Sequence, residues 1–357
     1  MLTDCPSPYQ VELFNEIAAQ SKCELEVAYL RGRDPARQWT SAEIRHESME
    51  LSNGGFSRAR ESVRRADLVV FNYYLHANAE RLIDERARAG GPWCFWGERP
   101  GFHQPLWLGR LVRKWKLAKL HASPAPIWGI GEFAIDGYKQ EFGTARDYFN
   151  LPYFSDLKRF ETNGREEKRE RVFLFCGSLI PRKGVDLVAS AFARLGEANV
   201  RLRIVGDGPL RESLMQKLAA VKERVEFVGF RDWHELPREY AAADVLCVPS
   251  RYDGWGLVVP EGLAAGLPVI ATDRMGAALE FVRTGKNGWL IPAGDEEALL
   301  RALCEAASGE LPAGARESVS EHTLEHGADR FSRYTHEVVA GWFHTKAQRQ
   351  THRHKSS

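Results

Sequence analysis

Residues 248–270 read VPSRYDGWGLVVPEGLAAGLPVI, and their order predicts a strand, a tight turn and a helix. The apolar strand ends shortly before Asp253, the turn contains Gly254 and Gly256, and the apolar helix that follows contains Glu261. Glycines let backbone N–H groups approach an anion closely, and a helix N-terminus carries partial positive charge, so this corner suits a phosphate group. The alternative is a structural corner in which Asp253 caps the helix and Glu261 is solvated.

A second stretch of the same kind, FCGSLIPRKG, occupies residues 175–184. A strand ends at Gly177, a turn with Pro181 follows, and Arg182 and Lys183 lie where a helix begins. Two cations at the start of a helix are unfavourable for its dipole unless an anion lies between them and the helix. The alternative is a pair of solvated surface cations. Both stretches follow strands, and open α/β sheets bind ligands at the carboxyl ends of their strands.

The same alternation of strand and helix patterns extends along most of the chain. Short apolar runs separated by helical patterns predict strands at residues 25–30, 66–74, 93–96, 126–131, 172–178, 200–206, 225–229, 244–250, 268–272 and 288–291. Strands that alternate with helices predict βαβ units around a parallel sheet. Residues 1–4 offer only a very short first strand, unless the recorded start lies downstream of the natural one.

A polar and highly charged segment at residues 156–171 interrupts this alternation. Such a segment is typical of a linker between domains. We therefore expect a first domain at residues 1–155 and a second at residues 172–327. The basic tail at residues 343–357 is expected to be disordered.

Composition excludes several classes of protein. The 357 residues include 49 Lys and Arg against 48 Asp and Glu, a net charge of +1, so we expect no nucleic-acid partner, because such binders are usually far more basic. No apolar run reaches the ~18 residues of a membrane-spanning helix, and the start lacks the pattern of a signal peptide. The six cysteines are scattered without a CxxC or Cys/His cluster, which predicts a reducing, cytoplasmic location and no zinc site.

Six motifs between residues 175 and 302 carry a family resemblance, and in order they read GSLIPRKGVDLVASAF, LRIVGDGPL, VEFVGF, ADVLCVPS, YDGWGLVVPEGLAAGLPVIAT and TGKNGWLIPAGD. This half of the chain resembles the nucleotide-sugar domain of the family 4 retaining glycosyltransferases, which have the GT-B fold. The first half is similar in architecture and in the start PSPYQVELFNEIA at residues 6–18. The resemblance implies an α/β protein of GT-B architecture, in which two Rossmann-like, doubly wound domains face a central cleft. The first domain would bind the acceptor and the second the nucleotide sugar, with a helix near residues 328–342 packing back on the first.

The resemblance also implies roles for individual residues. The family signature is two glutamates separated by seven residues; here Asp253, one methylene shorter than Glu, would contact the donor sugar, and Glu261 the ribose hydroxyls. Lys183 matches a lysine that holds the diphosphate, and these three residues are the expected catalytic set. Ser178 occupies the place of a frequent arginine, whose charge Arg182 is expected to supply. The donor-binding residues implied are Gly177, Ser178, Arg182, Phe230, Gly254, Gly256, Val258, Val259 and Glu280.

For Glu280 the alternative is a solvated helix residue.

On the acceptor side, the candidates lie near the first turn and near the strand end WGERPG. They are Tyr9, Gln10, Glu98, Arg99 and His103.

These assignments predict a retaining glycosyltransferase that moves a hexose-type sugar from a nucleotide-diphosphate sugar to a glycan, a glycolipid or another hydroxyl acceptor. No acidic DxD pair lies in a suitable loop, so the sequence predicts independence from metals, with the nucleotide sugar as co-substrate and no further cofactor. The resemblance implies a front-face mechanism, in which the leaving phosphate oxygen helps to deprotonate the acceptor. The alternatives are a catalytically lapsed nucleotide-sugar-binding protein, suggested by Asp253 and Ser178, and a GT-B sugar-nucleotide epimerase.

Residues 104–121, QPLWLGRLVRKWKLAKLH, predict a basic helix with an apolar stripe that includes Leu111 and Trp115. Between Arg99 and Glu132 the chain has no acidic residue. Three interpretations stay open. The helix is a peripheral contact with anionic lipid at the inner face of a membrane, a core helix with a basic solvated face, or part of a basic groove for an anionic acceptor.

Overall fold

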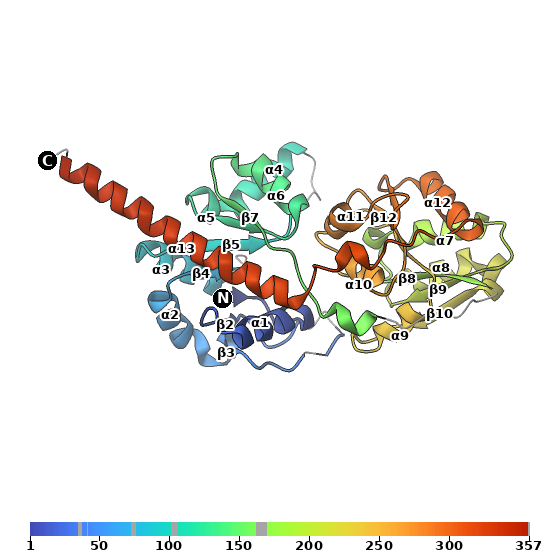
Figure 1. Cartoon of the computed structure of the whole chain (residues 1–357), viewed down its shortest axis with the longest axis horizontal. Coiled ribbons are helices and arrows are strands. Elements are labelled where there is room, and N and C mark those ends of the chain that lie inside the picture. Colours follow the sequence, from blue (N-terminus) through green and yellow to red (C-terminus); the bar gives the residue numbers. More distant parts are fainter. Residues whose placement is uncertain (35–37, 41, 73–75, 101–105, 162–169, 356–357) are drawn as a thin grey trace. The chain divides into compact units, whose positions relative to one another are not determined.

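The structure is a computed structural model that describes residues 1–34, 38–40, 42–72, 76–100, 106–161 and 170–355. The chain divides into two compact units. Met1–Phe154 and Leu324–Ser357 form the first unit, and Ser155–Thr323 forms the second. Each unit is built on its own parallel sheet, with helices around it (Figure 1).

The first unit contains a sheet of seven described strands in the order β3-β2-β1-β4-β5-β6-β7, and all neighbours are parallel. The strands are β1 (Leu2–Thr3), β2 (Glu26–Tyr29), β3 (Glu47–Glu50), β4 (Val69–Phe71), β5 (Trp93–Gly97), β6 (Ile127–Gly129) and β7 (Tyr148–Asn150). β1 has only two residues, yet it pairs with β2 on one side and β4 on the other. The sequence did not predict β3 and β7, because ESME is mostly polar and YFN is only three residues long.

The helices of the first unit are α1 (Pro8–Gln20), η1 (Leu51–Gly55), α2 (Phe56–Arg65), α3 (Ala77–Arg88), α4 (Leu106–Lys116), α5 (Ala118–His121), α6 (Glu132–Phe142) and α13 (Leu324–Lys355). α1 begins at Pro8, where the missing N–H of proline costs nothing. α13 packs against α1, and Lys22, two residues after the end of α1, forms a 2.5 Å ion pair with Asp329. This contact joins the last helix of the chain to the first.

α13 also corrects the expectation for the tail. The sequence predicts disorder from residue 343, whereas the helix continues to Lys355. No glycine or proline follows Gly341, and Lys, Ala, Gln and Arg are good helix formers. The charge of the tail therefore does not end the helix.

The second unit contains a sheet of six described strands in the order β10-β9-β8-β11-β12-β13, again with parallel neighbours. The strands are β8 (Arg171–Cys176), β9 (Val200–Val205), β10 (Val225–Gly229), β11 (Val245–Val248), β12 (Val269–Thr272) and β13 (Gly288–Ile291). β11 and β12 are buried along their whole length, as expected for inner strands covered by helices on both faces. The strand order has a reversal at β8, which is a typical ligand-binding position.

The helices of the second unit are η2 (Leu157–Phe160), η3 (Pro181–Lys183), α7 (Val185–Arg194), α8 (Arg211–Lys217), η4 (Ala219–Arg224), α9 (Leu236–Ala241), α10 (Val258–Ala264), α11 (Gly276–Phe281), α12 (Glu296–Ser308) and η5 (Glu317–Val319). α7 and α12 pack against each other and contribute Val188, Phe192 and Leu299 to the core of this unit. Two doubly wound, Rossmann-like α/β units are the fold class that the sequence predicts, and this prediction is confirmed.

Within the described residues, the structure contains no helix with the length and apolar character needed to cross a bilayer.

Candidate functional site

The carboxyl ends of β8 and β11 bring together the two stretches that stand out in the sequence. The strands are parallel neighbours, so the segments that follow them leave the sheet at the same edge. The ammonium group of Lys183 forms an ion pair with Asp253 Oδ2, across a separation of 70 residues in the chain. Arg182 Nη1 lies 3.9 Å from Asp253 Oδ1 and donates a 3.0 Å hydrogen bond to the carbonyl oxygen of Tyr252. The structure therefore gathers both cations around one carboxylate.

Gly184 allows this close approach. Its φ is +71°, in the left-handed region, and a Cβ at this position would lie 2.0 Å from the carbonyl oxygen of Pro249. A residue with a side chain meets both a backbone penalty and a clash there. Glycine at this position thus brings the turn after β8 against the end of β11.

An ion pair that the sequence did not suggest fastens the same two segments. Arg251 donates hydrogen bonds of 2.7 Å from Nη1 and Nη2 to the two carboxylate oxygens of Asp186, in the first turn of α7. The backbone N–H of Arg251 donates to the carbonyl oxygen of Arg182 at 2.8 Å. Burial alone would raise the pKa of Asp186, but the hydrogen bonds and charge of Arg251 outweigh it and lower that pKa. This pair holds the backbone that carries Arg182 and Lys183.

The segment around Asp253 is also tied to the turn after β12. The backbone N–H of Asp253 donates to the carbonyl oxygen of Arg274 at 2.9 Å, and that of Ala277 donates to Trp255 at 2.9 Å. The Trp255 ring is buried and packs edge-on against Phe281 of α11. The loop between β11 and α10 is therefore held from two sides, and Asp253 is buried within it.

Glu261 lies in the first turn of α10 with 9% of its surface exposed. The hydroxyl of Tyr240, a fully buried residue at the end of α9, donates a 2.9 Å hydrogen bond to Glu261 Oε2. Burial raises the pKa of Tyr240 far above its usual value, so the hydroxyl stays protonated as a donor. The thiol of Cys176 faces the same pair; burial, with a smaller effect from the Glu261 charge, raises its pKa to about 12.

These contacts contradict the structural-corner alternative. No side chain caps α10, so Asp253 is not its N-cap, and Glu261 is not solvated. Tyr240, by contrast, was missed in the sequence. Its only signal was its position, since it ends a helix that leads directly into the apolar strand β11.

The other expected donor-side residues lie along the same edge of the sheet. Gly177, with φ of +152°, and the exposed Ser178 follow β8, and Phe230 follows β10 with 40% of its surface exposed. Gly254 is buried and Gly256 half-buried.

Helices α10 and α11 carry the remaining expected residues. Val258 and Val259 form the first turn of α10, and Val259 is fully buried in the core. Glu280 lies half-buried on α11, so a fully solvated side chain does not describe it.

In the first unit, polar side chains gather at the carboxyl ends of β1, β4 and β5. Gln10 Nε2 donates to Asn72 Oδ1 at 3.0 Å, and Thr3 Oγ1 donates to the same oxygen at 2.9 Å. Asn72 Nδ2 in turn donates to the carbonyl oxygen of Trp96 at 2.8 Å. Gln10 was an acceptor-side candidate, whereas Asn72 was missed because nothing in the strand before it marks an asparagine as special.

Of the remaining acceptor-side candidates, some lie near this polar cluster and others do not. The ring of Tyr9 lies 4.7 Å from that of Tyr153, whose pKa burial raises well above its usual value. The Glu98 side chain is exposed, whereas Arg99 Nη1 donates to the carbonyl oxygen of Phe133 at 2.8 Å. His103 lies outside the described residues. Tyr9 and Gln10 therefore share one neighbourhood, and Arg99 turns toward α6.

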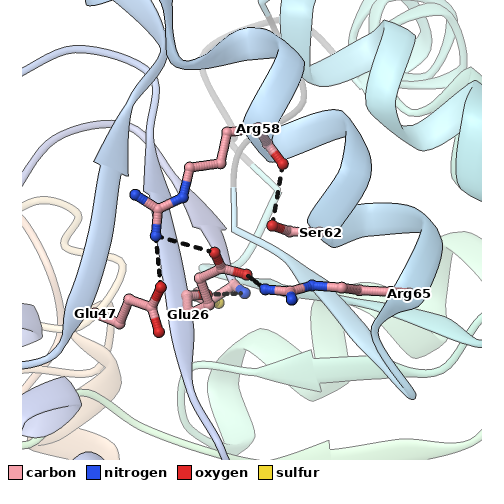
Figure 2. A network of polar contacts seen from close by, with 6 residues as sticks. Glu26, Glu47, Arg58, Ser62 and Arg65 are labelled. Carbon is pink, nitrogen blue, oxygen red and sulfur yellow. Dashed lines mark hydrogen bonds and ion pairs between the residues drawn. The ribbon is translucent and has the colours of Figure 1, made fainter.

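A charged network occupies the amino ends of β2 and β3 (Figure 2). Glu26 lies between two arginines of α2, at 3.5 Å from Arg58 Nη2 and 3.1 Å from Arg65 Nη2. Arg58 also pairs with Glu47. Burial would raise the pKa of Glu26, but hydrogen bonds from Ser62 and Arg65 lower it overall. Because parallel sheets bind ligands at the opposite edge, this network is a structural feature of the first unit.

In the part of the chain that the structure describes, no three His, Cys, Asp or Glu side chains are grouped so that they could bind a metal ion.

A parallel sheet with cations and a buried carboxylate at its carboxyl edge is the arrangement of nucleotide-binding α/β domains. A family model described as glycosyl transferases group 1 matches residues 170–308, which lie within the second unit. The second unit is therefore similar to this family over most of its length.

Two similar proteins with assigned names are mannosyltransferases. The GDP-mannose-dependent alpha-(1-6)-phosphatidylinositol monomannoside mannosyltransferase of Mycolicibacterium smegmatis is 29% identical over 62% of this chain and 63% of its own length. The GDP-mannose-dependent monoacylated alpha-(1-6)-phosphatidylinositol monomannoside mannosyltransferase of Corynebacterium glutamicum is 30% identical over 64% of this chain and 61% of its own. The chain thus aligns with about three fifths of the length of these curated relatives.

Solved structures match nearly the whole chain at low identity. Anabaena Alr3699/HepE, in complex with UDP and glucose, has a TM-score of 0.69 and 17% identity, covering 93% of this chain and 97% of that one. Sucrose-phosphate synthase from Thermosynechococcus elongatus has a TM-score of 0.71 and 20% identity, covering 96% and 100%. The likeness establishes that the chain has the GT-B fold, as the sequence predicts.

Proposed function

We propose that this protein is a retaining glycosyltransferase that moves a hexose-type sugar from a nucleotide-diphosphate sugar to a hydroxyl group of a glycan or lipid-linked acceptor, without a metal ion. The observation that carries the proposal is the pairing of Lys183 with Asp253 beside the buried Glu261, at the carboxyl edge of a sheet in a glycosyl transferases group 1 domain. GDP-mannose is the donor we favour, because both mannosyltransferases above are named as dependent on it.

Lys183 and Arg182 are proposed to stabilise the diphosphate. As the sugar bond breaks, negative charge grows on the leaving phosphate, and fixed cations stabilise that charge in the transition state. An ammonium group has three donors, so Lys183 can contact a phosphate oxygen while it keeps its bond to Asp253. The Arg251–Asp186 pair holds the backbone of both cations, so little rearrangement is needed when the diphosphate arrives.

Asp253 and Glu261 are proposed to hold the two ends of the donor. Tyr240 donates to Oε2 of Glu261 and so orients this carboxylate, which is proposed to accept a hydrogen bond from a ribose hydroxyl. Asp253 is committed to Lys183, which suits a carboxylate that orients sugar hydroxyls more than one that attacks the sugar. In this proposal the leaving phosphate oxygen deprotonates the acceptor, and no side chain acts as nucleophile.

The second candidate is a nucleotide-sugar-binding protein that has lost catalysis. It is favoured by the exposed, uncharged Ser178, which offers the diphosphate no charge, and by the ion pair that occupies Asp253. Both candidates predict nucleotide binding, and only the first predicts turnover.

The test uses the full-length chain with GDP-mannose, UDP-glucose and the free diphosphates. Thermal unfolding measures binding, because a ligand at about 100 times its Kd stabilises the folded state by ~2.7 kcal/mol. Release of nucleoside diphosphate, with and without glycan or lipid-linked acceptors, measures turnover. Stabilisation with release supports the transferase, stabilisation without release supports the lapsed binder, and no stabilisation by any nucleotide refutes both.

A further inference from the structure

Helix α4 turns its apolar side outward. Leu111 is 63% exposed, Val112 37% and Trp115 75%, and these are three of only seven large apolar side chains that are exposed among the described residues. A helix that served the core would bury such side chains, since burial of apolar surface drives packing. The interpretation of this segment as a core helix with a basic solvated face is therefore wrong for the described side chains of its apolar stripe, Leu111, Val112 and Trp115.

The inward side of α4 is held by other residues. Gly109 is buried, and Arg113 Nε donates a 2.9 Å hydrogen bond to Glu141 Oε2 of α6. Leu117, directly after α4, is 2% exposed. Figure 1 shows α4 beside α6, on the margin of the first unit. The outward orientation thus follows from specific contacts on the opposite side of the helix.

Lysines flank the apolar arc on both sides. At about 100° per residue, Leu111, Trp115 and Val112 span roughly 100° of the helix surface. Lys114 then lies about 60° before this arc and Lys116 about 40° after it. Both lysines are exposed, and they form no ion pair within the described part of the chain. An apolar stripe between two cationic edges is the pattern of helices that lie in the surface of an anionic bilayer.

The positive charge continues beyond α4. Residues 100–131 contain five Lys and Arg and no Asp or Glu. Lys119 of α5 forms a 2.5 Å ion pair with Asp84 of α3, which joins this segment to a neighbouring hollow of about 490 Å³. Four arginines line this hollow, Arg60, Arg64, Arg81 and Arg88, together with the acidic Asp84 and Glu85. Glu85 pairs with Arg60 and Arg64, so the lining has more cations than anions but is not uniformly basic.

We propose that α4 is a membrane-docking element of this protein, in which Trp115, Leu111 and Val112 enter the boundary between headgroups and acyl chains of an anionic bilayer. Lys114 and Lys116 contact the lipid phosphates at the edges of the stripe. Tryptophan suits this depth, because its ring is apolar while its N–H can reach water or a headgroup. The charge complementarity favours lipid over a second copy of the chain, which would present the same cations. The inference goes beyond the transfer reaction and does not depend on it.

The experiment is co-sedimentation of the full-length protein with two kinds of vesicle, one of phosphatidylcholine alone and one of equal parts phosphatidylcholine and phosphatidylglycerol. The wild type should bind the anionic vesicles and lose binding at high salt, because screening weakens contacts with lipid phosphates. Leu111→Ser with Trp115→Ser should weaken binding at least about tenfold, since two apolar side chains no longer enter the lipid. Lys114→Glu with Lys116→Glu should weaken it about 25-fold or more.

Matched variants in the second unit control for surface apolarity and net charge. Met215→Ser removes an apolar side chain that is 51% exposed, and Lys222→Glu with Lys286→Glu makes the same change in charge at exposed sites. Both should bind vesicles like the wild type. Because every changed side chain is on the surface, thermal unfolding should be nearly unchanged in all variants.

Three results would overturn the proposal. One is a wild type that ignores anionic vesicles. Another is vesicle binding that the α4 variants leave intact, which would place the lipid-binding surface of the protein outside α4. The third is a wild-type dimer, seen by light scattering, that the Trp115→Ser change dissociates while vesicle binding is absent; α4 would then contact a second copy.

Discussion

Replacement of Gly184 by alanine should damage the second unit and its candidate site together. A Cβ at this position would lie 2.0 Å from the carbonyl oxygen of Pro249, where real contacts need at least 3.0 Å, so the two segments must separate by about 1 Å. The φ of +71° adds a backbone penalty of ~1–2 kcal/mol for alanine. Overpacking of this kind costs ~1–3 kcal/mol. The free energy of unfolding of the second unit should therefore fall by ~2–5 kcal/mol.

Thermal unfolding and nucleotide binding measure the two consequences. For a unit of this size, ~2 kcal/mol corresponds to a decrease of at least about 4 °C in Tm. Nucleoside diphosphate affinity should fall about tenfold, because Lys183 precedes the altered residue and loses its position beside Asp253. The matched control is Gly196→Ala, whose Cβ would meet no atom within 4 Å and whose φ is not in the left-handed region. The control should stay within ~0.5 kcal/mol of the wild type.

Equal Tm values for Gly184→Ala and Gly196→Ala would refute the argument that the close approach of η3 to Pro249 requires glycine. A lower Tm with unchanged nucleotide affinity would support the packing argument but would show that Lys183 does not contact the nucleotide.

Three further predictions concern the site and the first unit. Lys183→Ala should lower nucleoside diphosphate affinity about 10- to 100-fold, since a hydrogen bond to a charged group is worth ~1.5–3 kcal/mol. If calorimetry finds the same Kd for the variant and the wild type, Lys183 does not bind the diphosphate. Glu261→Gln should raise the Kd for free nucleotide, whereas Asp253→Asn should mainly lower kcat, and the opposite pattern in titrations and initial rates would reverse their roles. Burial lowers the pKa of His46 from 6.5 to about 4, so the unfolded chain binds the proton more readily, and stability should fall as the pH drops from 6.5 to 4, by up to ~3 kcal/mol. Urea unfolding of the wild type and of His46→Gln at both ends of this range tests the pH effect, and equal pH dependence of the two proteins would contradict it.

The sequence by itself determined the plan of the fold. Short apolar runs separated by helical patterns are local signals, and they located eleven of the thirteen described strands, including the two-residue β1 as a very short first strand. The sequence did not predict β3 and β7, because short strands with polar residues form only when a neighbouring strand pairs with them. The helical continuation of α13 to Lys355 was missed for a different reason, since charge and position at the terminus outweighed good helix propensity in the prediction.

The sequence predicted only part of the candidate site. Lys183, Asp253 and Glu261 were marked by turns, glycines and family motifs that lie within a few residues of each. The contacts that hold these residues in place were not marked in the sequence. The Arg251–Asp186 and Tyr240–Glu261 contacts join residues that are far apart in the chain. Which residues meet depends on the order of strands in the sheet, and that order follows from packing of the whole unit.

Helix α4 separates the two kinds of information most clearly. The amphipathic pattern in residues 104–121 predicted a helix with an apolar stripe and basic flanks, and the same pattern suited a core helix, a groove and a membrane surface alike. Periodicity records which side chains share a face of a helix, whereas only the neighbours decide which face turns inward. Here the Arg113–Glu141 pair and buried Leu117 hold the opposite side against the first unit, so tertiary packing left Leu111 and Trp115 exposed.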